Sequence, residues 1–182
     1  MQKWKTLKTE TVFQAKPYVS IVKETVAVND AVTIEDFYKV NLRPFVACVP
    51  ILSDGNILML RQYKHGIGTI TLTFPGGFVE EGEPADLACQ RELLEETGYR
   101  SERLVPLGSF MDNGNQRGSL GTYFVAPHCT AFQAADSGDL EEMELLTMSS
   151  EEVDRVMNKG DIHITHHAFA WLMAKQWLNA QV

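Results

Sequence analysis

The sequence predicts an α/β fold, a sandwich built on a mixed sheet, with an antiparallel β arm at its N-terminus. Three observations support this fold class. Residues 4–40 alternate polar and apolar side chains as strands do, residues 45–52 are mostly apolar like a buried strand, and residues 84–97 are rich in helix formers. We expect the arm to span residues 1–42 and a second domain to span residues 43–182.

The arm is expected to contain a β-hairpin. Its first extended segment runs from Val19 to Val28, Asn29 and Asp30 follow as turn residues, and a second extended segment covers residues 32–40. Asparagine and aspartate favour turns because their side chains bond to the backbone a few residues on.

Six further strands are expected in the second domain. The turn Ser53-Asp54-Gly55-Asn56 separates the first two of them. The six segments are residues 45–52, 57–60, 69–74, 104–110, 121–125 and 141–148.

Three helices are predicted from capping signals and apolar composition. Pro84 suits the start of the first helix, and Gly98 suits the left-handed residue just past its end. Ser149 followed by Glu152 is a capping box for a short second helix, and residues 167–178 form an apolar, aromatic C-terminal helix.

Composition indicates a compact globular protein of the cytoplasm. The chain has 182 residues, of which 45% are hydrophobic and 22% charged, and its formal net charge is −8. This acidic balance disfavours nucleic acid and anionic membranes as partners. No apolar stretch is long enough to span a membrane, and no apolar run follows the first lysines as it would in a secretory signal. Of the three cysteines, Cys48 and Cys89 lie in apolar patterns and are expected to be buried thiols.

One face of the first predicted helix carries three carboxylates. Glu92, Glu95 and Glu96 stand at positions i, i+3 and i+4, and Arg91 lies four residues before Glu95, at the spacing of a helical ion pair. Crowded carboxylates repel one another and stay ionised most easily beside a cation. Hard oxygen donors suit Mg²⁺, with Mn²⁺ as the alternative. A solvated acidic helix face is the plainer interpretation of the same residues.

A longer pattern surrounds these carboxylates. Residues 77–99 read GFVEEGEPADLACQRELLEETGY and fit G-x5-E-x7-R-E-U-x-E-E-x-G-U, where U is a bulky apolar residue. The fixed places are held by Gly77, Glu83, Arg91, Glu92, Glu95, Glu96 and Gly98. This pattern is the Nudix box, and the chain resembles a Nudix hydrolase, which implies an α/β/α sandwich.

The resemblance continues outside the box. The segment YVSIVKETVAVND, the run Leu60-Arg61-Gln62-Tyr63-Lys64 and the segment DLEEMELLTMSSEEV are similar to the N-terminal arm, the basic element and the late acidic loop of ADP-ribose pyrophosphatases. In that subfamily the arm crosses to the partner subunit, so the resemblance implies a homodimer.

The resemblance also assigns roles to the box residues. It implies that Glu92, Glu96 and the backbone carbonyl of Gly76 ligate Mg²⁺, and that Glu95 orients Arg91 or helps to bind metal. In ADP-ribose hydrolases the general base lies on the late loop. Its candidates here are Asp139, Glu141 and Glu142, of which Glu141 is preferred because it directly precedes a strand pattern.

Three residues outside the box and the late loop are expected to contact substrate. Arg61 is the candidate for binding the diphosphate group of a substrate, because a guanidinium can donate hydrogen bonds to two oxygens at once. Arg117 is a candidate for a phosphate or sugar contact, equally well explained as a surface arginine, and Phe37 is the candidate for stacking on the base.

The resemblance implies cleavage of a nucleoside diphosphate sugar such as ADP-ribose into a nucleoside monophosphate and a sugar phosphate. Members selective for ADP-ribose carry a proline about fifteen residues after the box, and residues 112–115 read DNGN instead. This difference favours a broader nucleoside diphosphate sugar hydrolase.

Other functions remain open at this point. A coenzyme A or nucleoside triphosphate pyrophosphatase would share the box, and a non-catalytic sensor or a scaffold protein would share the fold. His163, His166 and His167 have a spacing that suggests a metal site, but no accompanying motif supports it, so cap and surface roles are preferred.

Overall fold

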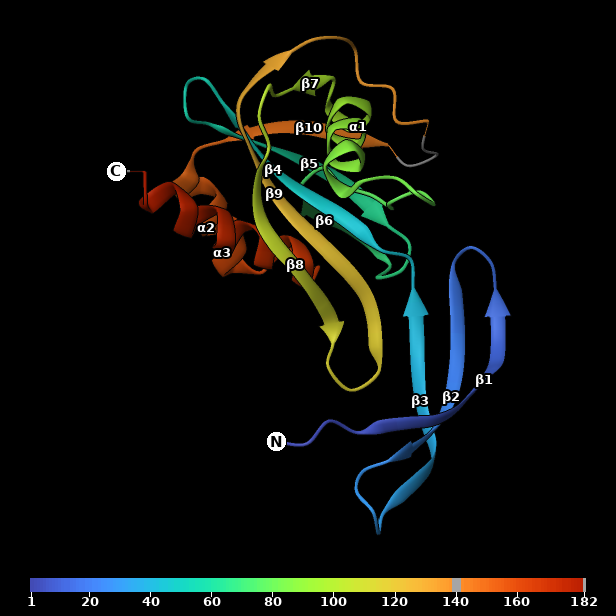
Figure 1. The fold of residues 1–182 in the computed structure, drawn as a ribbon. Helices are drawn as coiled ribbons and strands as arrows, with labels where there is room; N and C mark the ends of the chain where they lie inside the picture. The colour runs from blue at the N-terminus through green and yellow to red at the C-terminus, as the bar shows by residue number, and fades with distance from the viewer. Residues whose placement is uncertain (139–141, 182) are drawn as a thin grey trace. The chain divides into compact units, whose positions relative to one another are not determined.

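The computed structural model describes residues 1–138 and 142–181 (Figure 1). Two compact units make up the chain. The first contains Met1–Pro44 and Phe110–Gly121, and the second contains Phe45–Ser109 and Thr122–Val182. Strands β8 (Val105–Asn113) and β9 (Arg117–Ala131) contribute residues to both units.

The first unit consists of an antiparallel β arm and the tip of the β8–β9 hairpin. Strands β1 (Lys5–Ala15), β2 (Val19–Ala27) and β3 (Thr33–Leu42) pair in chain order, both times antiparallel. The predicted turn at Asn29 is confirmed, because its side-chain oxygen accepts hydrogen bonds from the backbone N–H groups of Ala31 and Val32, both at 2.9 Å. Residues 40–41 of β3 pair in parallel with residues 117–118 of β9, which makes the sheet mixed.

The second unit contains the remaining strands. β4 (Phe45–Leu52) lies between β9 and β5 (Ile57–Lys64), and β10 (Met143–Met148) pairs antiparallel with the other edge of β5. The short strand β6 (Thr69–Thr73) also pairs antiparallel with β5, and β7 (Tyr99–Arg100) pairs antiparallel with β9. Successive side chains of a strand point to opposite faces of the sheet, so these strands present two faces that helices can cover.

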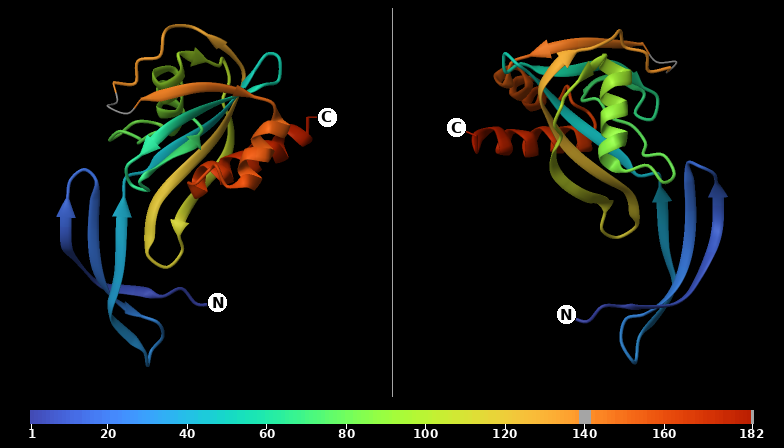
Figure 2. Two further views of the ribbon diagram at one scale, coloured as in Figure 1. Left: turned by 180° about the vertical axis from the view of Figure 1, so that it is seen from behind. Right: turned by 45° about the horizontal axis from the view of Figure 1, so that its top comes forward.

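Helices cover both faces of this sheet (Figure 2). On one face, α1 (Ala85–Thr97) packs against Val46, Cys48 and Phe124. On the other, α2 (Ser150–Lys159) and α3 (Thr165–Asn179) pack over a larger cluster. The α/β/α sandwich expected from the sequence is therefore confirmed. Among the described residues, no helix has the length and apolar character needed to cross a membrane.

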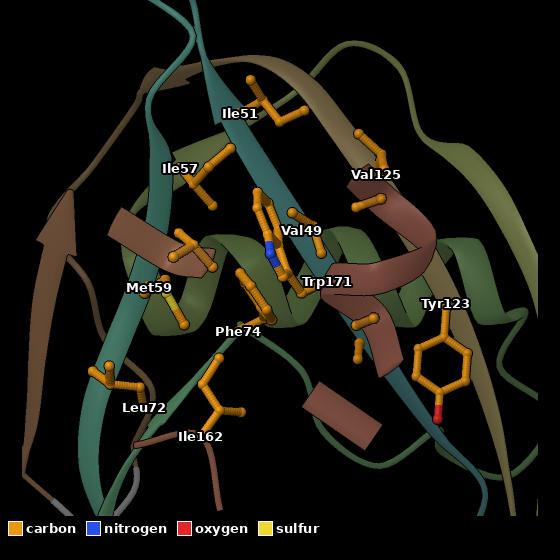
Figure 3. Packing of buried hydrophobic residues seen from close by; sticks show 14 residues of the cluster. Val49, Ile51, Ile57, Met59, Leu72, Phe74, Tyr123, Val125, Ile162 and Trp171 are labelled. Atoms are coloured by element: carbon orange, nitrogen blue, oxygen red, sulfur yellow. The ribbon is translucent and has the colours of Figure 1, made fainter. Parts of the chain in front are cut away.

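The larger cluster lies between the sheet and α3 (Figure 3). Trp171 of α3 is fully buried and stacks on Phe74, with ring centroids 6.2 Å apart. The indole N–H donates a 2.9 Å hydrogen bond to Asp154 of α2, which leaves no buried donor unpaired on this ring. Phe74 is the residue that precedes the Pro75-Gly76-Gly77 loop, so this packing fixes the start of the loop.

Candidate active site

Helix α1 presents the three predicted carboxylates. Pro84 is its N-terminal cap residue, and Gly98 ends it in the left-handed conformation with φ 73°, its N–H bonded to Leu94. A side chain at position 98 would meet the Gln133 carbonyl oxygen at 2.2 Å, so glycine is required there. On the helix, Glu96 is buried, the Glu92 side chain is 14% exposed and the Glu95 side chain is 40% exposed.

The loop before the box lies directly against β4. The backbone N–H groups of Cys48 and Val46 donate to the carbonyl oxygens of Pro75 and Gly77, each at 2.9 Å. The N–H of the intervening Gly76 instead donates to Glu96 Oε2 at 2.8 Å. The loop is thus hydrogen-bonded to a strand on one side and to α1 on the other.

Two consecutive glycines permit this close approach. A Cβ atom on Gly76 would lie 2.2 Å from the Val46 carbonyl oxygen, and a Cβ atom on Gly77 would lie 2.4 Å from the Glu92 carboxylate. Any other residue would displace either the strand or the carboxylate. Glu92 and Glu96 therefore converge on the same Gly76-Gly77 dipeptide.

Arg91 holds the acidic groups in place. Its Nε and Nη2 atoms bond to both carboxylate oxygens of Glu83, while Nη1 bonds to Glu92 at 2.7 Å and to Glu95 at 3.2 Å. Nη2 also donates to the Phe78 carbonyl at 3.1 Å. These contacts raise the pKa of Arg91 above its ordinary value, and the hydrogen bonds to Glu83 make the largest contribution. The expected ion pair between Arg91 and Glu95 is confirmed, and Glu83 and Glu92 are additional partners.

The donor chemistry of this cluster suits a hard divalent cation. Two carboxylates touch one dipeptide, and carboxylate oxygens are the ligands that Mg²⁺ prefers in proteins. No three His, Cys, Asp or Glu side chains within residues 1–138 and 142–181 already converge as a complete metal cage. One oxygen of Glu92 accepts a hydrogen bond from Arg91, and one oxygen of Glu96 accepts a hydrogen bond from the Gly76 N–H.

The structure places Arg61 beside the late loop. Arg61 on β5 forms a 3.2 Å ion pair with Glu144 on β10, and both side chains are more than half exposed. A cavity of about 490 Å³ brings Arg61 together with Glu142, the described candidate for the general base. The other two candidates, Asp139 and Glu141, lie outside the described residues.

Arg117 and Phe37 belong to the first unit. Arg117 has a positive φ of 76° at the start of β9, where it pairs in parallel with Val40 of β3. Phe37 packs edge-on against Trp4, with ring centroids 6.2 Å apart. Their substrate roles stay predictions.

Lys64 was not singled out in the sequence, yet it lines a cavity together with the Gly76-Gly77 loop. This cavity has a volume of about 480 Å³ and includes Gly76 and Gly77 in its wall. Lys64 is the last residue of the same basic run as Arg61. The run alone did not show which of its two cations faces the loop, because that depends on how the end of β5 packs against residues 164–167.

His167 is a second residue whose position the sequence did not reveal. It is only 6% exposed, and its Nδ1 atom accepts a 3.2 Å hydrogen bond from the Phe74 N–H. Burial lowers the pKa of His167 well below its ordinary value, so the ring is neutral and carries its proton on Nε2. The expected surface role is therefore wrong for His167, which instead anchors α3 to the start of the loop.

Comparisons with known proteins agree with this geometry. The NUDIX domain family model matches residues 41–169. The chain belongs to the Nudix family. The ADP-ribose pyrophosphatase of Bacillus subtilis is 24% identical over 181 residues, which cover 97% of this chain and 96% of that protein. The methanol dehydrogenase activator of Bacillus methanolicus is 27% identical over 160 residues, covering 87% of this chain and 85% of the activator.

Two further similarities bear on this Nudix protein. The ADP-sugar pyrophosphatase of Mus musculus is 44% identical over 61 residues, which cover 31% of this chain and 28% of the mouse protein. A solved structure titled as an ADP compounds hydrolase superimposes with a TM-score of 0.83 at 22% identity, covering 100% of this chain and 97% of that one. The predicted membership of the Nudix family is confirmed by the family model, and the predicted resemblance to ADP-ribose pyrophosphatases is confirmed over nearly the whole chain.

Proposed function

We propose that this Nudix enzyme is a metal-dependent hydrolase that splits the diphosphate of nucleoside diphosphate sugars such as ADP-ribose. The products would be a nucleoside monophosphate and a sugar phosphate. The observation that carries the proposal is the convergence of Glu92 and Glu96 on the Gly76-Gly77 loop. The similarity to the ADP-ribose pyrophosphatase of Bacillus subtilis over nearly the full length of both chains supports the substrate class.

Mg²⁺ is the proposed cofactor, with Mn²⁺ as the alternative. Glu92, Glu96 and the Gly76 carbonyl would hold it, and Glu95 would support them. When bound, such a cation neutralises charge on the diphosphate oxygens and lowers the pKa of a coordinated water. Arg91 contributes by holding Glu92 and the loop in one arrangement, so that little reorganisation is needed during the reaction.

The substrate contacts follow from the two cavities beside β5. Lys64 and Arg61 would bind the negatively charged diphosphate. Such local cations are needed because a chain with a net charge of −8 does not attract an anionic substrate at long range. The general base is proposed on the late loop, at Glu141 or at Glu142, which lines the cavity of Arg61. Arg117 and Phe37 are proposed contacts to the sugar or phosphate and to the base.

A homodimer formed through the arm is part of the same proposal. Strand β1 is exposed along its whole length, and its exposed side chains include Leu7, Val12 and Phe13. Large exposed apolar side chains on an edge strand are typical of a surface that another chain covers. The cytoplasmic location and the lack of nucleic acid or membrane partners stay predictions from composition.

A substrate panel tests the proposed function. Nucleoside diphosphate sugars, coenzyme A and nucleoside triphosphates are each incubated with the protein and Mg²⁺, and the products are identified by chromatography. We expect ADP-ribose to give AMP and ribose 5-phosphate, with no reaction in the presence of a chelator. Turnover of coenzyme A or a nucleoside triphosphate alone would show another Nudix pyrophosphatase, and binding without turnover would show a sensor.

A further inference from the structure

The segment that joins β7 to β8 and the C-terminal end of α3 line a common cavity in the second unit. We name it the β7–α3 cavity, and five residues define it: Arg100, Glu102, Arg103, His128 and Trp177. Its volume of about 320 Å³ is at the lower end of the range for small-molecule sites. Among the described residues, it shares no lining residue with the cavities of Arg61 and Lys64 and contains none of the proposed metal ligands. It is therefore separate from the candidate active site.

Two guanidinium groups of the β7–α3 cavity have no carboxylate partner in the described part of the chain. Within residues 1–138 and 142–181, no ion pair joins Arg100 or Arg103 to an acidic side chain. The Arg100 guanidinium instead lies 4.1 Å over the Phe132 ring. This stacking uses only the face of the group, so the N–H donors at its edge can still reach a ligand. Guanidinium groups bind phosphate oxygens in pairs of hydrogen bonds, so two of them in one wall favour a phosphate group.

The backbone around this cavity is held in one arrangement. The Ser101 hydroxyl lies 2.8 Å from the carbonyl oxygen of Arg103 and 2.5 Å from that of Pro127, so it connects the segment after β7 to β9. The next residue, His128, has a φ of 55°, which is in the left-handed region although the residue is not a glycine. This conformation is costly for a residue with a Cβ atom, and such residues gather at binding sites, where the surrounding structure enforces them. The backbone that carries Arg103 and His128 is therefore fixed before any ligand binds.

Two other defining residues supply contacts for a nucleoside. Trp177 is half-buried and packs against the core of the second unit, so its indole ring is a fixed surface on which a planar base can stack. Glu102 is a carboxylate, and a carboxylate accepts hydrogen bonds from the hydroxyl groups of a ribose. Its single negative charge is outweighed by the two guanidinium groups, so the cavity still attracts a phosphate.

We infer that the β7–α3 cavity binds a nucleoside monophosphate. Arg100 and Arg103 bind its phosphate, while Glu102 accepts hydrogen bonds from the ribose. Trp177 stacks on the base. The inference goes beyond the proposed function and does not depend on it, because no bond of the ligand is broken in this cavity and no proposed catalytic or metal-binding residue lines it.

Isothermal titration calorimetry with AMP tests the inference. The protein is titrated in the presence of a chelator, so that no metal ion draws the nucleotide to the candidate active site. We expect AMP to bind at least about tenfold more tightly than ribose 5-phosphate, which lacks the base, or adenosine, which lacks the phosphate. Arg103→Gln should weaken AMP binding about tenfold or more, because a charge-assisted contact to the phosphate is lost.

Two control variants should bind AMP as the wild type does. Arg155→Gln removes an exposed arginine of α2 that does not line the cavity, and Arg61→Gln removes a cation of the candidate active site. Arg103 is exposed, so Arg103→Gln is expected to fold, and thermal unfolding verifies this. A second measurement uses tryptophan fluorescence, which AMP should quench in the wild type and not in Trp177→Phe.

The outcomes separate this inference from the proposed function. Absence of AMP binding at millimolar concentration, binding no tighter than that of ribose 5-phosphate, or binding that Arg103→Gln leaves unchanged would each overturn the inference. AMP binding that only Arg61→Gln weakens would assign the nucleotide to the candidate active site and would overturn it too. Hydrolysis of ADP-ribose with Mg²⁺ should be the same in Arg103→Gln as in the wild type. A failed substrate panel would refute the proposed function and leave the result of the AMP titration valid.

Discussion

Arg91 and Glu83 form a two-point ion pair, with Nε to Oε1 at 2.9 Å and Nη2 to Oε2 at 3.0 Å. Glu83 also accepts a hydrogen bond from the Glu80 N–H, so the pair ties the loop before α1 to the middle of the helix. The contact with Arg91 lowers the pKa of Glu83 to about 2. The remaining bonds of Arg91 reach Glu92 and Glu95, so one side chain positions most of the acidic cluster.

Replacing Arg91 should impair catalysis more than folding. In Arg91→Lys a single ammonium replaces the planar fork, and it cannot hold Glu83 and Glu92 at once. We expect kcat/KM for ADP-ribose to fall about 10- to 100-fold and the Mg²⁺ concentration for half-maximal rate to rise, as for other groups that orient metal ligands. Steady-state kinetics against Mg²⁺ concentration measures both. Arg155→Lys on the exposed side of α2 is the control. An Arg91→Lys variant with the kcat/KM and the Mg²⁺ dependence of the wild type would contradict the positioning role of Arg91.

Glu96→Gln should remove activity while the protein stays folded. The amide oxygen still accepts the hydrogen bond from Gly76, but the negative charge that a divalent cation requires is lost. We expect kcat to fall by at least about 100-fold, the size of effect seen when one group that stabilises charge is removed. Kinetics with ADP-ribose and circular dichroism test this, with the exposed Glu81→Gln as control. Wild-type rates in Glu96→Gln would exclude the assignment.

Alanine at the two loop glycines should give opposite results. In Gly77→Ala the atoms nearest to the new methyl group belong to the end of the Glu92 side chain, which can shift without moving the backbone. The fold should therefore survive, and kcat/KM should fall about tenfold or more because a proposed metal ligand is displaced. In Gly76→Ala the methyl group meets the backbone of Val46 and Ala47, which should lower the free energy of unfolding by about 1–3 kcal/mol or more. Urea unfolding and kinetics separate the two effects.

Gly114→Ala is the control for both loop variants, because a methyl group there meets nothing within 4 Å. It should change neither stability nor rate. Should Gly77→Ala unfold the protein, or Gly76→Ala leave its stability intact, the described loop packing would be incorrect.

The neutral His167 should make the fold sensitive to acid. Burial holds its folded-state pKa below the ordinary value of 6.5, so on acidification through that pH the unfolded chain takes up a proton that the folded chain does not. The free energy of unfolding should therefore fall as the pH drops below 6.5, by up to about 1.4 kcal/mol per pH unit for one proton.

His167→Asn tests this prediction, since its side-chain oxygen replaces Nδ1 as acceptor for the Phe74 N–H and does not titrate. Urea unfolding between pH 5 and 7.5 should show a shallower loss of stability in the variant. Identical slopes in the two proteins would mean that the pKa of His167 is the same in the folded and the unfolded chain, which would contradict the prediction.

The arm should hold two chains together. We expect light scattering at micromolar concentration to give twice the chain mass of 20.4 kDa. Leu7→Glu and Phe13→Glu should shift the protein towards the monomer, because each buries a charge in the proposed interface. Leu172→Glu, on an exposed position of α3, should not. A wild-type protein that is monomeric and fully active would disprove the proposed assembly.

Local sequence signals predicted most of the elements. Gly98 and Ser149 correctly marked one end of α1 and the start of α2, because each acts through its own backbone geometry or side chain. The segment around residues 110–121 was less predictable, since the sequence indicated two shorter strands that end at residue 110 and begin at residue 121. In the structure β8 and β9 continue to a tight turn, where the Asn113 side chain accepts hydrogen bonds from two backbone N–H groups.

The candidate site was predictable where its members lie close together in the chain. The box places Glu92, Glu95, Glu96 and Arg91 within two turns of one helix, and their spacing alone determines a common face. Lys64 and His167 come from segments about one hundred residues apart and meet the loop only through tertiary packing. No local periodicity reports such contacts, and for this reason both residues became visible only in the structure.

The burial of all three cysteines has a practical consequence. Cys48, Cys89 and Cys129 are at most 3% exposed. The neighbouring Cys89 thiol and burial raise the pKa of Cys48, and burial raises the pKa of Cys129 to about 12. Alkylating reagents act on exposed thiolates, so the native thiols are protected as long as the sheet and α1 stay packed. A single cysteine introduced on the surface would then be the one fast-reacting thiol. Dyes and spin labels can therefore be attached at chosen positions without first removing the natural cysteines.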